Sequence, residues 1–164
     1  MTDSFSHFDE DGASRMVDVG QKLPTDRRAV ASGIVRMRPE TLVAIRDKQL
    51  SKGDVLEVAR LAGIMATKQT SHLIPLCHPI AVDAVTVDFD FPDEHSVRIQ
   101  STVSVTAKTG VEMEALTSVT VTALTIYDMC KSIDRDMEIV AVRLEEKSGG
   151  RSGLYIRSES PTND

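Results

Sequence analysis

The chain has 164 residues, of which 41% are hydrophobic and 27% are charged, with a formal net charge of −6 and a pI near 5.2. This composition predicts a single soluble domain with a substantial core. The acidic balance argues against a nucleic-acid or membrane surface, because both require a dense basic face. Cys77 and Cys130 lack close partner spacing, and we expect neither a signal peptide nor a membrane span, so a reducing cytoplasm is the expected location.

The two ends of the chain lack the patterns of packed structure. Residues 1–15 are acidic and without periodicity, and they predict a flexible arm. Residues 16–153 are expected to form the single α+β domain, and residues 154–164 a C-terminal tail. Met16 to Val19, at the start of the domain, predicts a short extended piece.

The next third of the chain predicts one strand and two helices. Arg28 to Met37 favours a strand that Pro39 ends. Pro39 stands at a first helical position and predicts a short helix that ends near Leu50. Asp54 is a candidate N-cap of the second helix. The apolar residues of that helix recur at helical spacing: Val55, Val58, Ala59, Ala62, Met65 and Ala66.

A proline-flanked segment and a hairpin follow. Two prolines deny Leu73 to Ile80 both a helix and a central strand, so we expect an extended connection with Cys77 and His78 at its middle. Val85 to Phe91 and Val97 to Thr106 alternate apolar and polar residues. The turn-rich residues between them predict an antiparallel hairpin with one wet face.

Lys108 to Ile133 predicts the central helix. Val119 and Val121 could instead start a strand, but the helical period continues past them. The apolar stripe consists of Leu116, Val119, Ala123, Ile126, Cys130 and Ile133. Polar groups crowd both ends of this helix: Glu112 and Glu114 at the start, and Asp128 and Lys131 off the stripe near the end. A capped core helix with a surface ion pair would also explain them.

Val140 to Glu145 alternates as a last strand. The predicted order is therefore one strand, two helical pieces, two strands, the central helix and a final strand. This order predicts an α+β fold of the ferredoxin-like (split βαβ) type, a four-stranded antiparallel sheet backed by helices.

The segment from Glu145 to Gly153 has three glycines, which free the backbone to present N–H groups to an anion, together with the cations Lys147 and Arg151. A flexible exit loop is the alternative. The order of a Walker loop is absent, and no GxGxxG occurs.

A transition-metal site is not expected, although the chain contains ligand types. Adjacent Cys77 and His78 lack the spacing of a structural zinc knuckle, and neither HExxH nor CxxC is present. His78 is either a satisfied core histidine or an acid, base or phosphate donor held in a rigid segment.

Six segments together resemble one known family. They are MVDV (16–19), KGDVLEVARLAGIMATKQT (52–70), LIPLCHP (73–79), KTGVEMEALT (108–117), ALTIYDMCK (123–131) and KSGGRSG (147–153). The family is cyclic pyranopterin monophosphate synthase, the molybdenum cofactor biosynthesis accessory protein called MoaC. The resemblance covers roughly residues 16 to 153, and its LCHP, GVEMEAL and YDMCK blocks are specific.

The resemblance implies a lyase that rearranges a cyclised dihydro-GTP into a pyranopterin, closes a cyclic phosphate and releases diphosphate. Such chemistry requires proton shuttles and cations for the phosphates. Asp128, Lys131 and Lys52 match the catalytic residues of the family. The substrate-binding candidates are Leu76, Cys77, His78, Glu112, Met113 and Glu114, with Lys147, Lys68, Arg27 and Arg151 for the phosphates. No cofactor is expected, although magnesium can assist through the substrate phosphates.

The resemblance also implies a homo-oligomer, a hexamer built as a trimer of dimers with active sites at the dimer interface. Glu112 and Asp128 are 16 residues apart in the sequence, about 24 Å on a continuous helix. Either two antiparallel central helices of a dimer share one site, or a bent start at Gly110 to Glu114 shortens the span.

Two other classes of function remain open. A non-catalytic nucleotide-sensing module could use the same scaffold. An RNA-binding ferredoxin-like domain fits poorly, since the chain has no Trp, four Phe and two Tyr and therefore lacks stacking platforms. The predicted partner is a small nucleotide, with no nucleic acid and no membrane.

Overall fold

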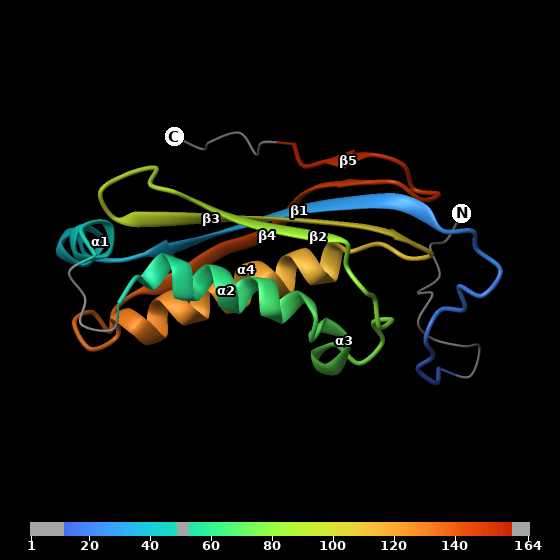
Figure 1. Ribbon diagram of the computed structural model, residues 1–164, viewed down its shortest axis with the longest axis horizontal. Coiled ribbons are helices and arrows are strands. Elements are labelled where there is room, and N and C mark those ends of the chain that lie inside the picture. The colour runs from blue at the N-terminus through green and yellow to red at the C-terminus, as the bar shows by residue number, and fades with distance from the viewer. Residues whose placement is uncertain (1–11, 49–52, 159–164) are drawn as a thin grey trace.

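The computed structural model describes residues 12–48 and 53–158 and shows an α+β fold in which helices pack on a single antiparallel sheet (Figure 1). The strands are β1 (Thr25–Arg36), β2 (Ala84–Asp90), β3 (Ser96–Ala107), β4 (Glu138–Ser148) and β5 (Tyr155–Ile156). The helices are α1 (Pro39–Arg46), α2 (Val55–Thr67), α3 (Thr70–Leu73) and α4 (Glu112–Cys130).

The sheet has the strand order β2-β3-β1-β4-β5, with antiparallel pairing between neighbours. β1 and β2 are therefore parallel to each other with β3 between them, which is the split βαβ arrangement that the sequence predicts. The predicted count of four strands is wrong for the described residues, because β5 pairs with β4 through Glu146 and Lys147. β5 comes from the stretch that was expected to be a tail. The glycines that precede it reverse the chain and bring it to the edge of β4.

α2 and α4 lie side by side against one face of the sheet (Figure 1). The sheet residues that point toward them alternate with polar ones, as on β3, where Val97, Ile99 and Val103 are fully buried. The two helices approach closely at Gly63, where a Cβ would collide with Thr122 Oγ1. The core therefore lies between the helical layer and one face of the sheet.

Local signals set the helix boundaries. α1 begins at Pro39, and the Asp54 side chain caps α2 by accepting from the backbone N–H of Glu57 at 3.3 Å. α1 ends at Arg46, earlier than the predicted Leu50, which itself lies outside the described residues. Lys52, which was predicted to take part in the chemistry, lies outside them as well.

α4 confirms the predicted central helix, and four residues of its stripe, Val119, Ala123, Ile126 and Cys130, are 0% exposed. Ile133 was assigned to that stripe wrongly. It lies beyond the end of the helix and is 42% exposed, because the chain turns away from the core after Cys130.

Two connecting segments complete the fold. Residues 74–83 form no helix or strand, as the prolines predict, and the backbone makes a turn at Pro75 and Leu76. Residues 15–24 do not form a strand either, so the extended piece predicted at 16–19 lies in the chain as irregular structure. Each described helix is too short or too polar to cross a bilayer.

Candidate active site

A cavity of about 240 Å³ lies at the end of the molecule where α4 begins. The proline-flanked connection contributes Leu76, Cys77 and His78 to its wall, and the first turn of α4 contributes Glu112, Met113 and Glu114. These are six of the ten residues predicted to bind the substrate; the other four are the predicted phosphate ligands. The fold thus brings together two segments that are more than thirty residues apart in the sequence.

The N-terminal segment closes a third side of this first cavity, which sequence reasoning did not anticipate. Val17, Val19 and Lys22 line the cavity. The His78 ring Nε2 donates to the backbone carbonyl of Val17 at 2.8 Å, which leaves Nδ1 of a neutral ring as an acceptor. Lys108 Nζ donates to the Gly20 carbonyl at 2.7 Å and so holds the same segment through a second contact.

Two titratable groups of the first cavity are shifted toward their neutral forms. Burial raises the pKa of the Glu114 carboxyl, which is 3% exposed, and the negative charge of Glu112 adds to this effect. Burial also raises the pKa of the Cys77 thiol, and the charge of Glu114 contributes. Burial in this wall therefore favours the protonated form of the Glu114 carboxyl and the thiol form of Cys77.

A second cavity, of about 560 Å³, adjoins the first and is lined by cations. Lys22 lines both cavities, and Arg27 and Arg151 line the second. Arg27 is held in place because its Nε donates to the Ala107 carbonyl at 2.9 Å. Gly150 has a φ of 71°, and a Cβ there would collide with the Arg27 guanidinium. The glycine run thus packs the exit turn against Arg27.

The remaining predicted phosphate ligands lie at varying distances from this second cavity. Lys147 Nζ donates to Ser152 Oγ, and Ser152 lines the cavity. Lys68 is exposed at the end of α2 and is among the lining residues of neither cavity in the described structure. Lys52 lies outside the described residues, so its predicted role in the chemistry stays a prediction.

The predicted catalytic pair lies at the opposite end of α4. Lys131 Nζ donates to Asp128 Oδ1 at 2.6 Å, and both side chains are more than half exposed. α4 is continuous from Glu112 to Cys130, so Glu112 and Asp128 are about 24 Å apart along its axis. The helix is therefore not interrupted between Glu112 and Glu114, which disfavours the alternative of a broken helix start within one chain. One chain does not bring the catalytic pair to the first cavity.

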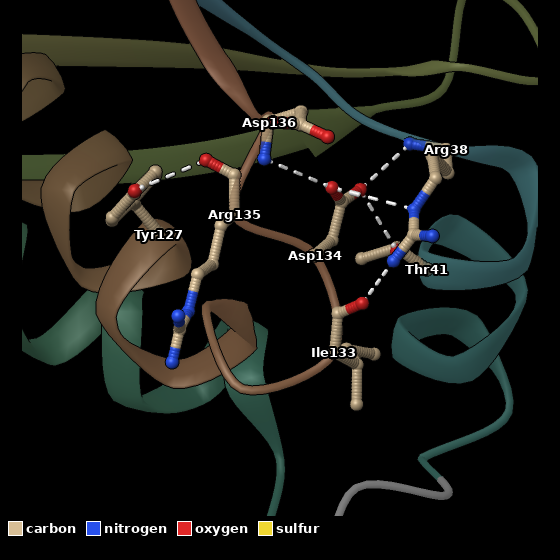
Figure 2. A network of polar contacts seen from close by, with 7 residues as sticks. All are labelled: Arg38, Thr41, Tyr127, Ile133, Asp134, Arg135 and Asp136. Carbon is tan, nitrogen blue, oxygen red and sulfur yellow. Dashed lines mark hydrogen bonds and ion pairs between the residues drawn. The ribbon is translucent and has the colours of Figure 1, made fainter.

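The turn that follows α4 is tied down by a buried carboxylate (Figure 2). Asp134 is 1% exposed and accepts from the Arg38 backbone N–H at 2.9 Å and from the Thr41 hydroxyl at 3.0 Å. The backbone N–H of Asp136 and the guanidinium of Arg38 also reach it. Burial alone would raise the pKa of Asp134, but these donors outweigh it and hold the pKa below its ordinary value. Sequence reasoning missed Asp134, because no periodicity or motif marks it.

Within the described ranges, no group of three or more His, Cys, Asp or Glu side chains is arranged to hold a metal ion. The independence of the chemistry from a transition metal remains a prediction.

Comparison with known proteins matches the chain to a family profile and to similar proteins that share one description. The MoaC family profile matches residues 16–150. The cyclic pyranopterin monophosphate synthase of Magnetococcus marinus is 61% identical over 155 residues, which cover 94% of this chain and 95% of that protein. The synthase of Heliobacterium modesticaldum is 58% identical over 158 residues, 96% of this chain and 99% of that protein. A third, from Desulfitobacterium hafniense, is 56% identical over 154 residues, 94% of each chain.

Proposed function

The chain belongs to the MoaC family, and we propose from this premise that it is a cyclic pyranopterin monophosphate synthase of molybdenum cofactor biosynthesis. Its substrate is then a cyclised dihydro-GTP, and its products are cyclic pyranopterin monophosphate and diphosphate. The observation that carries the proposal is the first cavity, where six of the ten predicted substrate-binding residues converge from two distant segments.

The two adjoining cavities suit the two parts of such a substrate. The first has the mixed apolar and titratable wall that a purine undergoing rearrangement requires, with Glu114 and His78 as proton carriers. The second offers Lys22, Arg27 and Arg151 to the triphosphate, and these cations would stabilise the departing diphosphate. As Lys22 lines both cavities, it would hold the substrate at the joint between base and phosphates.

The reaction type that follows is that of a phosphorus–oxygen lyase. A hydroxyl of the substrate gives its proton to one of the enzyme's proton-transfer groups and attacks the α-phosphorus. The new P–O bond closes the cyclic phosphate, and the bond from the α-phosphorus to the oxygen that bridges it to the β-phosphorus breaks. Diphosphate leaves with the bonding electron pair. Asp128 and Lys131 are the groups that we assign to proton transfer, with Lys52 as a third. No cofactor is included, although magnesium can neutralise the phosphates.

The length of α4 supports a site shared by two chains. In a two-fold dimer with antiparallel α4 helices, the first cavity of one chain faces Asp128 and Lys131 of the other, so both ends serve one substrate. Three such dimers would form the hexamer that the resemblance implies. A cytoplasmic location likewise stays part of this proposal.

Incubation with the cyclised dihydro-GTP tests the proposal directly. We expect stoichiometric release of diphosphate and a pterin product, and no diphosphate from ordinary GTP, which lacks the cyclised bond. Tight binding of the cyclised nucleotide without any product would instead identify a nucleotide-sensing module.

A further inference from the structure

The buried cluster around Asp134 lies at the turn that directly follows the predicted catalytic pair Asp128 and Lys131. We propose that Asp134 is a positioning residue: it fixes the turn after α4 and thereby holds Lys131 in the geometry that turnover requires. This inference rests on the proposed function, in which Lys131 acts on the substrate.

The turn is a short hydrogen-bonded link between Lys131 and Asp134. The backbone N–H of Lys131 donates to the Tyr127 carbonyl at 2.8 Å. The N–H groups of Ile133 and Asp134 both donate to the Cys130 carbonyl, at 2.9 and 3.1 Å. Only two residues separate Lys131 from the Asp134 anchor, so the backbone of Lys131 is held from the helix on one side and from the turn on the other.

The anchor fastens this turn to α1 rather than to α4 itself. The Arg38 N–H and the Thr41 hydroxyl, both at the start of α1, converge on Asp134 Oδ2. The Arg38 guanidinium bridges the same carboxylate and the Ile133 carbonyl, as Figure 2 shows. These contacts fix the position of the turn relative to the sheet, because α1 follows directly on β1.

A second tie comes from the residue that precedes Asp128. The Tyr127 hydroxyl donates to the Arg135 carbonyl at 3.2 Å (Figure 2). The Tyr127 carbonyl accepts from the backbone N–H of Lys131. Tyr127 and Asp134 therefore close the turn from both sides.

The choice of a carboxylate here is informative. Asp134 is 1% exposed, and a buried carboxylate is a weak source of stability because its desolvation offsets most of the attraction. The carboxylate instead fixes the geometry of the turn, since four donors must be positioned around its two oxygens. The Lys131 side chain is more than half exposed and is held by its ion pair with Asp128, so the turn contributes by fixing the backbone from which that side chain extends.

The test compares three full-length variants. Asp134→Asn keeps the shape and removes the charge, and Thr41→Val removes a single donor. Asp136→Asn is the matched control: it makes the same change in the same turn, but its side chain is exposed and its backbone N–H to Asp134 is retained. Diphosphate release gives kcat and KM, and amide hydrogen exchange reports the turn independently of activity.

For Asp134→Asn we expect kcat to fall about 10- to 100-fold with KM changed less than about twofold, since misplacing a reacting group affects the chemical step. Exchange at Lys131, Ile133 and Asp134 should accelerate while Val119, in the middle of α4, stays protected. Thr41→Val should lower kcat by about three- to tenfold, and Asp136→Asn should match the wild type.

Two results overturn the positioning role. One is a kcat for Asp134→Asn within twofold of the wild type, and the other is exchange that rises along the whole of α4, which marks general destabilisation. If Asp134→Asn does not fold, Thr41→Val decides, and an unchanged kcat refutes the role. A wild-type protein that releases no diphosphate refutes the proposed function instead.

Discussion

A subunit-mixing experiment tests whether two chains share each active site. The perturbations are Glu112→Ala, in the wall of the first cavity, and Asp128→Ala, at the far end of α4. Each is expected to be inactive alone. Co-expression lets the two mutant chains assort at random.

The expected activity follows from the geometry of α4. Glu112 and Asp128 are about 24 Å apart on a continuous helix, too far for one nucleotide to contact both in one chain. In a shared site, half of the dimers carry one chain of each kind. Each of these dimers has one site with both residues mutated and one with both intact, so activity should recover to ~25% of the wild type.

Diphosphate release from the cyclised dihydro-GTP measures the recovery. A matched control mixes Asp128→Ala with Lys131→Ala. Both lie at the same helix end, so no mixed dimer has an intact site and no recovery is expected. Tagged chains establish that subunits exchange. An inactive mixture of Glu112→Ala and Asp128→Ala with proven exchange would refute the shared site.

Four further outcomes are expected. Asp128→Ala and Lys131→Ala should each abolish turnover while costing about 1 kcal/mol or less in chemical denaturation, because the pair is exposed; near wild-type turnover would remove them from the chemistry. Glu114→Gln should raise the melting temperature at pH 7. The pKa of Glu114 is raised in the folded state, so ionisation of this carboxyl above its ordinary pKa of 4.5 destabilises the fold, and the neutral amide avoids that cost. The gain should vanish below about pH 4, where the carboxyl is neutral in both states, and a gain that does not depend on pH contradicts the account. Gly63→Ala should lower the urea midpoint. Crowding Thr122 costs about 1–3 kcal/mol, which exceeds the helix-propensity gain of about 1 kcal/mol. A raised midpoint would argue against a tight contact between α2 and α4 at this position. Turnover should survive a zinc chelator, and complete loss restored by zinc alone would reverse this expectation.

Much of the fold could be predicted because its signals are local. Alternation in β2 and β3, the Asp54 cap and the Pro39 start each depend on residues within one or two turns of the chain. The stripe of α4 also gave the right helix, although it extended the period to Ile133. Periodicity records which face is apolar, but it does not record where the backbone leaves the core.

Six residues of the first cavity were identified by resemblance, and their sequence positions gave no reason for them to meet. Val17 lies in one of the segments that carry the resemblance, but neither it nor Lys22 was assigned to the site, since a valine and a lysine in an irregular segment are ordinary until the fold places them in the wall of the first cavity. The same holds for Asp134, one acidic residue among 25 Asp and Glu.

The sequence by itself determined the kind of elements, their order and the chemical types available to the site. Only the tertiary structure decided which of these groups are buried, and burial is what raises the pKa of Glu114 and makes Asp134 an anchor. It also decided that α4 runs without interruption from Glu112 to Cys130, which separates the two predicted halves of the site. The physical reason is that propensity and periodicity act over a few residues, whereas desolvation and distance between groups depend on packing across the whole chain.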